Sequence, residues 1–133
     1  PGAIAEFPAH WLLAGVVLLW VAGFDVIYAL ADRAFDRGAG LFSVPARFGV
    51  GGALWIARGL HVGAAACLTL VWVIDPRLAW LFGIGVVLTL GLLIAEHEVV
   101  RRRGEAGLHL AFFTINGIVS VLLGALGIAD IAI

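Results

Sequence analysis

Long apolar runs alternate along this chain with short breaks that contain glycine, proline or charged residues. Four runs are long enough to cross a hydrocarbon core, which takes about 20 helical residues. They cover about 11–24 with a continuation into an acidic segment, then about 50–74, 78–95, and 110 to the C-terminus. The breaks between them carry residues that end helices. The pattern therefore predicts an all-α integral membrane protein with four transmembrane helices.

Composition supports this prediction and excludes other classes of protein. Hydrophobic residues make up 63% of the 133 residues, charged residues 13%, and the mean hydropathy is +1.13, which is outside the range of soluble globular domains. No repeat of fixed period divides the chain, so residues 1–133 form a single transmembrane domain. The net charge of −1 argues against a nucleic-acid partner, which would require a basic surface.

The arginines predict how the helices are oriented in the membrane. Arg33, Arg37 and Arg47 lie around the first break and residues 101–103 form a run in the third, whereas the second break has only Arg77. Basic residues are enriched in cytoplasmic loops. We therefore expect the first and third breaks to be cytoplasmic and both chain ends to lie outside, in a bacterial inner membrane.

Three carboxylates follow the first apolar run, although the segment is otherwise apolar enough to span a membrane. At 100° per residue, Asp25, Asp32 and Asp36 fall within about 20° of one helical stripe, with Tyr28 beside it. Ionisable residues in a membrane segment are costly and usually face a functional site. Carboxylates together with substrate phosphates are typical ligands of Mg²⁺. The stripe therefore predicts a magnesium site at the cytoplasmic end of this helix.

A purely structural explanation of the acids is also possible. Asp32 and Asp36 would then pair with Arg33, Arg37 or Arg47 at the membrane surface, where such ion pairs are common and contribute little free energy. This alternative leaves the deepest acid, Asp25, unexplained. The metal site is therefore the preferred hypothesis.

Two segments resemble the UbiA superfamily of membrane prenyltransferases. The later one is similar to the last helix of the quinone-pathway branch, which includes the 4-hydroxybenzoate polyprenyltransferases, and covers residues 111–120. The earlier one resembles the family's second aspartate-rich motif. Its matching residues are Asp25, Tyr28, Asp32, Asp36, Gly40, Leu41, Ser43, Pro45, Arg47, Phe48 and Gly49.

The resemblance implies a function and a role for each motif residue. The family transfers a polyprenyl chain from its diphosphate to an aromatic acceptor, here in quinone biosynthesis, within a lipid bilayer and with Mg²⁺ as cofactor. Asp32 and Asp36 would be Mg²⁺ ligands, and Asp25 and Tyr28 would be catalytic residues near the reacting carbon. Arg47 would bind substrate.

The chain also departs from the family pattern. It lacks the family's first motif, NDxxDxxxD, and it has too few helices for the full bundle. We therefore expect the C-terminal half of a prenyltransferase bundle, completed by a missing N-terminal half or a larger membrane complex. Two alternatives stay open: transfer to a tetrapyrrole, as in chlorophyll synthase, and a noncatalytic scaffold subunit of a respiratory or photosynthetic assembly.

For the other polar residues in the membrane spans, we predict structural roles. Arg58 and His61 share a helical face, and we expect His61 to pack against the acidic helix and Arg58 to be a structural counter-ion. Adjacent helical residues point in different directions, so residues 96–98 should form an interfacial surface with the arginine run. Asn116 is expected to make an interhelical hydrogen bond. Two tryptophans near span ends fit an aromatic belt, Trp11 and Trp80.

Overall fold

A computed structural model of the chain describes residues 8–32, 38–103 and 110–133, with the side chains of 31–32 and 110–112 excepted. Every regular element in these ranges is helical. In chain order they are α2 (Pro8–Tyr28), the 3₁₀ turn η1 (Ala29–Asp32), α4 (Val44–Ile74), α5 (Trp80–Arg103), the π-helical segment η2 (Leu110–Ile115) and α7 (Asn116–Ala132).

Four helices are long and apolar enough to cross a membrane, which confirms the predicted all-α membrane fold. They are Pro8–Tyr28, Val44–Ile74, Trp80–Arg103 and Phe113–Ala132. Large apolar side chains remain exposed along each of them, for example Leu18, Val73 and Ile94, each 71% exposed. Such outward apolar faces are expected where helices contact lipid or further transmembrane helices.

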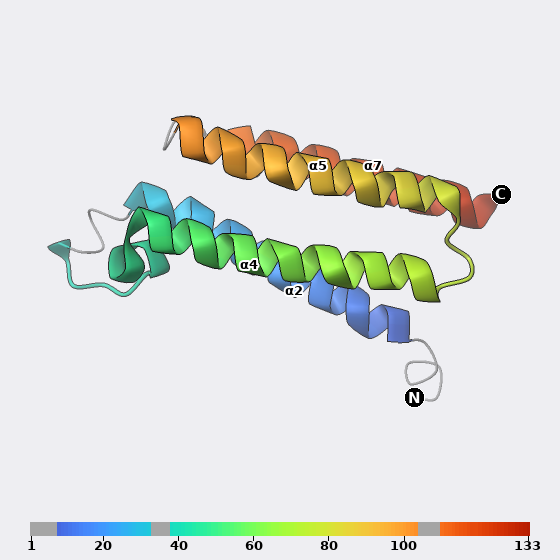
Figure 1. The fold of residues 1–133 in the computed structure, drawn as a ribbon, viewed down its shortest axis with the longest axis horizontal. Helices are drawn as coiled ribbons and strands as arrows, with labels where there is room; N and C mark the ends of the chain where they lie inside the picture. Colours follow the sequence, from blue (N-terminus) through green and yellow to red (C-terminus); the bar gives the residue numbers. More distant parts are fainter. Residues whose placement is uncertain (1–7, 33–37, 104–109) are drawn as a thin grey trace.

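The helices form two pairs that lie side by side (Figure 1). α2 packs against α4, α5 packs against α7, and α4 contacts α5 between the pairs. One end of the bundle holds the end of α2, the start of α4, the end of α5 and the start of α7, and we call it the motif end. The start of α2, the α4–α5 connection and the end of α7 lie at the opposite end. The start of α2 and the end of α7 therefore lie on the same side of the bundle, as the prediction for the two chain ends requires.

Two apolar clusters hold the helices together. The cluster at the motif end joins α2, η1, α4 and α5, and includes Ile27, Leu30, Ala53 and Val100. The cluster toward the opposite end joins α2, α4 and α5, with Leu123 of α7 packed against it. Its buried members are Val16, Leu68, Val71, Phe82 and Val86. Between the clusters, α4 and α5 bury polar side chains, which are described with the candidate site.

An ion pair closes the α4–α5 connection. The Asp75 carboxylate accepts hydrogen bonds from the backbone N–H of Arg77 at 3.0 Å and from its guanidinium at 2.9 and 2.7 Å. The hydrogen bonds from Arg77 lower the pKa of Asp75 below its ordinary value, and the same contact raises the pKa of Arg77. Asp75 is buried whereas Arg77 is 55% exposed, so the pair fixes a tight turn at the edge of the membrane region.

The start of α5 is capped from another helix. Ala79, which precedes α5, has no side-chain acceptor for the free N–H groups of the first turn. Asp130 of α7 supplies one, because its Oδ2 accepts from the backbone N–H of Ala79 at 2.9 Å and of Phe82 at 2.6 Å. A carboxylate is also favoured at this positive end of the helix dipole. This contact fixes α7 against the start of α5.

The third span is longer than predicted. Its apolar run was expected to end near residue 95, but α5 continues as regular helix to Arg103. Glu96 and His97 are therefore placed within a helix that crosses the bundle, two turns before its end. The α-helix of the first span is shorter than predicted, because it ends at Tyr28 and does not continue through the acidic motif.

Candidate functional site

Asp25 and Tyr28 lie together on the outward face of α2. The opposite face of the same turns is buried, with Phe24 and Ile27 directed toward α4. Residues three apart share a helix face, so Asp25 and Tyr28 point the same way. Both are exposed, Tyr28 by 46%. These two predicted site residues are therefore reachable from outside the four described helices.

The rest of the acidic motif begins where α2 changes geometry. The chain turns from α-helix to 3₁₀-helix at Ala29, and Asp32 ends that turn. A 3₁₀-helix has 3.0 residues per turn, so the α-helical rotation that was used to place Asp32 on the stripe of Asp25 does not apply over Ala29–Asp32. The predicted α-helical stripe is therefore wrong between Asp25 and Asp32. The side chain of Asp32 and all of Asp36 lie outside the described residues, so their role as metal ligands stays a prediction.

The motif residues after the acids build a specific turn into α4. Ser43 is the N-cap, with Oγ accepting from the backbone N–H of Ala46 at 3.2 Å, and Pro45 lies in the first turn, where proline is tolerated. Gly40 and Gly49 have φ angles of +70° and +75°, which disfavour side chains. Gly49 kinks α4, so the long membrane helix begins at residue 50, as the sequence predicted.

Arg47 lies on the short first turn of α4, between its cap and its kink. Its side chain is exposed and lines a hollow of about 300 Å³ together with residues 40–42 and Ala46. Within the described ranges Arg47 forms no ion pair. The alternative in which it pairs with Asp32 or Asp36 involves side chains outside those ranges.

Packing brings these segments to the same end of the bundle. Leu30 of η1 belongs to one apolar cluster with Ala53 of α4 and Val100 of α5. The end of α2, the first turn of α4 and the arginine run 101–103 therefore lie at the motif end (Figure 1). This arrangement brings the described part of the acidic motif, Arg47 and the arginine run 101–103 to one end of the bundle.

A second polar cluster, which the sequence analysis missed, is buried between α4 and α5. His61 Nδ1 lies 2.9 Å from His97 Nε2 and 3.8 Å from Glu96 Oε1. The exposed fractions are 3% for His61, 0% for Glu96 and 9% for His97. The prediction that Glu96 and His97 form an interfacial surface is therefore wrong. Both flank His61, which points between them.

His61 also contacts α2, as predicted. Its Nε2 lies 3.2 Å from the carbonyl oxygen of Trp20, and its ring meets Phe24 edge to face with centroids 5.2 Å apart. Gly23 makes the approach possible, because a Cβ there would lie 2.3 Å from the ring. His61 therefore connects three helices, α2, α4 and α5.

A groove of about 460 Å³ runs beside this cluster between α4 and α5. Apolar side chains such as Leu93 line most of it, with His61 and His97 also on its wall and Arg58 and Arg101 among its lining residues. Glu96 is not part of the lining and lies deeper. The histidines thus separate an enclosed carboxylate from an open, mainly apolar space.

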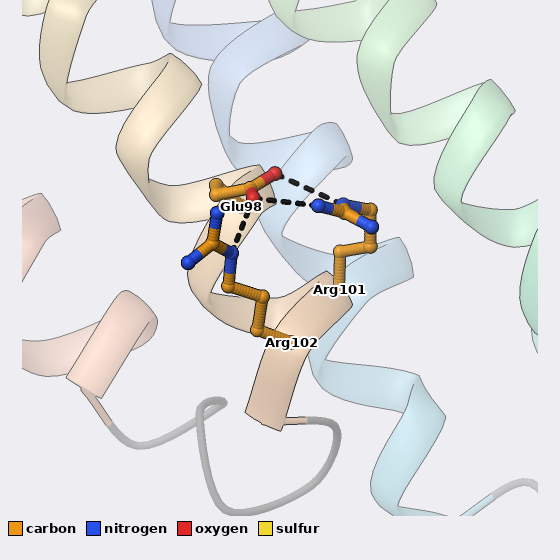
Figure 2. Close-up of polar contacts among 3 residues, drawn as sticks. All are labelled: Glu98, Arg101 and Arg102. Atoms are coloured by element: carbon orange, nitrogen blue, oxygen red, sulfur yellow. Dashed lines mark hydrogen bonds and ion pairs between the residues drawn. The ribbon is translucent and has the colours of Figure 1, made fainter.

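Glu98 shows the surface arrangement that was predicted for its neighbours. Figure 2 shows its carboxylate between two arginines, with Arg101 donating at 2.9 and 2.6 Å and Arg102 donating through Nε. Glu98 is 39% exposed and the arginines 56% and 71%. The interfacial prediction is therefore right for Glu98.

Two structural predictions for single residues are not supported. Arg58 makes no ion pair in the described part of the chain, and its guanidinium lies 5.0 Å from the centre of the Trp55 ring on its own helix. The Asn116 side chain makes no hydrogen bond there, whereas its backbone carbonyl accepts from Ser120 Oγ at 2.9 Å.

Trp11 and Trp80 are 66% and 67% exposed at helix ends, as an aromatic belt requires.

The motif end fits a hard divalent cation by the chemistry of its donors. Carboxylates at positions 25, 32 and 36 are the oxygen ligands that Mg²⁺ prefers, and Arg47 is an exposed cation able to contact a phosphate. The buried cluster offers two imidazoles and one carboxylate, a different donor set. The two regions therefore suit different kinds of ligand.

Comparison with known proteins agrees with the motif. A 4-hydroxybenzoate octaprenyltransferase of Nitrosomonas europaea is 31% identical over 122 residues, which are 90% of this chain and 40% of that protein. A 4-hydroxybenzoate solanesyltransferase of Synechocystis is 40% identical over 75 residues, 55% of this chain and 25% of that protein. A 4-hydroxybenzoate octaprenyltransferase of Tolumonas auensis is 28% identical over 120 residues, 90% of this chain and 41% of that protein.

The chain spans about 40% of the length of relatives such as those from Nitrosomonas and Tolumonas. No solved structure gives a significant match. The family model described as the UbiA prenyltransferase family matches residues 3–127, which is nearly the whole chain. Both the motif resemblance and this match lead to one conclusion: the chain belongs to the UbiA prenyltransferase family.

Proposed function

We propose that the protein containing this chain transfers a polyprenyl group from its diphosphate to an aromatic acceptor of the 4-hydroxybenzoate type, in quinone biosynthesis. The family match over residues 3–127 carries the proposal, and the relatives named above act on 4-hydroxybenzoate. The chain would supply the second aspartate-rich motif and the C-terminal part of the bundle. A region carrying the first motif, in the same protein or in a partner subunit, would complete the site.

The motif residues have distinct tasks in this proposal. Asp32 and Asp36 would hold Mg²⁺, directly or through water, and the ion would supply positive charge for the diphosphate group. Arg47 contacts a diphosphate oxygen from the first turn of α4. The exposed position of Arg47 beside the acidic segment, at the motif end, supports this task.

Asp25 and Tyr28 would act one to two helical turns deeper in the membrane. Transfer breaks the allylic carbon–oxygen bond and forms a carbon–carbon bond to the ring, whose proton is then lost. Positive charge develops on the allylic carbon, and the face of the Tyr28 ring and the Asp25 carboxylate can both stabilise it. Their shared exposed face supports this assignment.

The arginines support one orientation of this site. Among the described residues, Arg47 and the run 101–103 lie at the motif end, whereas Arg77 lies in the connection at the opposite end. In the sequence, Arg33 and Arg37 stand between α2 and α4. Because basic residues are enriched in cytoplasmic loops, this distribution supports a motif end that faces the cytoplasm of a bacterial inner membrane. Diphosphate substrates and Mg²⁺ are then available on the side where the acids lie.

The test uses the complete protein in membranes with a polyprenyl diphosphate and 4-hydroxybenzoate. Prenylated product is measured by chromatography across a range of Mg²⁺ concentrations, and chelation should abolish it. Asp32→Asn and Asp36→Asn should each lower turnover by about a thousandfold, equivalent to about 4 kcal/mol of transition-state stabilisation. Asparagine keeps the size and polarity of aspartate, so membrane expression should be unchanged.

Glu98→Gln is the matched control. It also removes one carboxylate near the motif end, but this carboxylate pairs with arginines at the surface. Its turnover should stay within about twofold of the parent, because exposed ion pairs contribute little. Equal activity of all three variants, or product formed without Mg²⁺, would contradict the proposal and favour a noncatalytic scaffold.

A further inference from the structure

The buried polar cluster is not explained by the proposed prenyl transfer. His61, Glu96 and His97 lie between the two apolar clusters, on the side of α2 that carries Phe24, whereas Asp25 is exposed on the opposite face. Glu96 is fully buried, and neither of its oxygens has a hydrogen-bond partner among the described residues. A buried carboxyl group without partners costs several kcal/mol in an apolar surrounding. Such a carboxyl group must either be protonated and hydrogen-bonded to a partner, or stay ionised and bind a cation.

The hydrogen bonds fix which atoms of the cluster can bind a cation. The Trp20 carbonyl can only accept, so His61 Nε2 carries a proton and donates to it at 3.2 Å. The lone pair of His61 is then on Nδ1, which faces His97 Nε2 at 2.9 Å and Glu96 Oε1 at 3.8 Å. Three ligand atoms therefore converge from one residue of α4 and two of α5, all within 4.8 Å of one another.

These distances are close to those of a bound transition metal. Ligand atoms about 2.0–2.1 Å from a tetrahedral ion lie about 3.3 Å from one another. The His61–His97 separation of 2.9 Å would have to widen by about 0.4 Å and the His61–Glu96 separation of 3.8 Å to shorten by about 0.5 Å. The ligand atoms of Glu96 and His97, which lie within 4.8 Å of each other, would have to reach the same spacing by side-chain rotation. The hydrogen bond from His61 to the Trp20 carbonyl is the kind of contact that usually orients a metal-binding histidine.

We propose that His61, Glu96 and His97 bind one divalent transition-metal ion of the zinc type between α4 and α5. Two imidazoles and a carboxylate favour such ions over Mg²⁺, which prefers oxygen ligands. The ion neutralises the Glu96 carboxylate and joins α5, and with it α7, to the α2–α4 pair. The fourth ligand position faces the apolar groove, because His61 and His97 line that groove and Glu96 does not.

A metal-free hydrogen-bond network satisfies the cluster less well. His97 Nε2 could donate a hydrogen bond to His61 Nδ1. Glu96 Oε1 then lies 3.8 Å from His61 Nδ1, which is beyond hydrogen-bond distance. Both Glu96 oxygens and His97 Nδ1 stay without partners. A metal bound through Glu96 Oε1 would give that oxygen a partner and neutralise the carboxylate, whereas Glu96 Oε2 and His97 Nδ1 would stay without a contact among the described residues.

The test titrates the complete purified protein with Co²⁺, an ion whose visible absorption reports ligand type and geometry. The protein is first stripped with chelator, then kept in excess Mg²⁺ so that all-oxygen sites are filled. One Co²⁺ per chain should bind with the intense visible bands of tetrahedral coordination, and Zn²⁺ should displace it. Either ion should raise the midpoint of thermal unfolding.

Matched variants separate the proposal from other causes. Glu96→Gln keeps the shape of the side chain but removes the ligand charge, and His97→Gln removes one imidazole. Each should weaken Co²⁺ binding at least about a hundredfold, whereas Glu98→Gln, two residues away and paired with arginines, should bind within about twofold of the parent. Circular dichroism and size-exclusion chromatography check that each variant is folded.

Two results would overturn the proposal. One is a folded parent protein that shows no tetrahedral Co²⁺ spectrum. The other is a folded Glu96→Gln or His97→Gln variant that binds Co²⁺ as tightly as the parent. If Glu96→Gln raises the midpoint of thermal unfolding and the parent protein binds neither Co²⁺ nor Zn²⁺, the cluster is a metal-free hydrogen-bond network. Prenyl transfer is not measured in this experiment, so its outcome is independent of the proposed function.

Discussion

The two polar regions of this molecule differ in burial and in how completely the chain forms them. At the motif end, Asp25 and Tyr28 face outward from a bundle that leaves them accessible. In the cluster, His61, Glu96 and His97 are enclosed by three helices. An exposed motif is stable without its partner region because its polar groups stay solvated, whereas a buried charge must be compensated within the fold. The first region is therefore expected to depend on another part of the protein, and the second on its own packing.

The largest effect should come from isolating this chain. On its own it has one aspartate-rich motif, and we expect no detectable prenyl transfer, because the diphosphate leaves with only part of its charge neutralised. Co-expression with the region that carries the first motif should restore activity. Product is measured in membranes with matched amounts of chain. Mg²⁺-dependent transfer by the isolated chain would show that the exposed region is already complete.

A methyl group at Gly23 tests the packing of the buried region. A Cβ there would lie 2.3 Å from the His61 ring, so Gly23→Ala should lower the free energy of unfolding by about 1–3 kcal/mol. Helix propensity alone predicts the opposite sign, since alanine is favoured over glycine by about 1 kcal/mol. Gly59→Ala on α4 is the control, because nothing lies within 4 Å of its Cβ position. Denaturation in detergent gives both values; a stabilising Gly23→Ala would contradict the described contact.

The helix that presents Glu96 and His97 depends on its cap from α7. Asp130→Ala removes the acceptor for two backbone N–H groups at the start of α5 and should cost about 1 kcal/mol. Asp130→Asn keeps one acceptor oxygen and should cost less. Hydrogen exchange of residues 79–83 provides the local measurement. Unchanged exchange in Asp130→Ala would mean that α5 begins without help from α7.

The smallest effect concerns Asp75, a carboxylate in the α4–α5 connection that has an arginine partner, in contrast to Glu96. Hydrogen bonds from Arg77 lower the pKa of Asp75, so ionised Asp75 stabilises the fold at neutral pH. This contribution is present above the ordinary aspartate pKa, about 3.9, and is lost as pH falls through the lowered value. The stability difference between the parent and Asp75→Asn should therefore shrink on acidification below about pH 4. Thermal unfolding from pH 7 to pH 3 measures it; a difference that grows toward low pH would contradict the assignment.

The sequence predicted the fold because long apolar runs and their breaks are local signals. The apolar run that begins near residue 50 predicted the start of the second membrane helix, and the structure has a kink at Gly49, directly before it. The prediction failed where geometry changes without a change in composition. Nothing in the segment 25–32 signals that α-helix gives way to a 3₁₀ turn at Ala29.

The buried cluster was missed for a traceable reason. Ending the third span near residue 95 put Glu96 and His97 outside the membrane region, where charged residues need no explanation. Adjacent residues on a helix point in different directions, so Glu96 and His97 were not expected to belong to one site. Both can nevertheless contact a residue of another helix that lies between them, here His61. Two ionisable residues just past an apolar run, with a histidine and a glycine on other spans, were the available signal. Which helices meet depends on tertiary packing and could not be read from spacing.

The cap on α5 has a consequence for biosynthesis. The ribosome makes α5 before α7, so the first turn of α5 enters the membrane without the carboxylate that will accept its free N–H groups. Until Asp130 arrives, those groups must stay near water or the translocation machinery, because unpaired backbone donors are costly in hydrocarbon. Insertion of the α5–α7 hairpin is then completed only when α7 has been synthesised, which makes the two helices a single unit of membrane assembly.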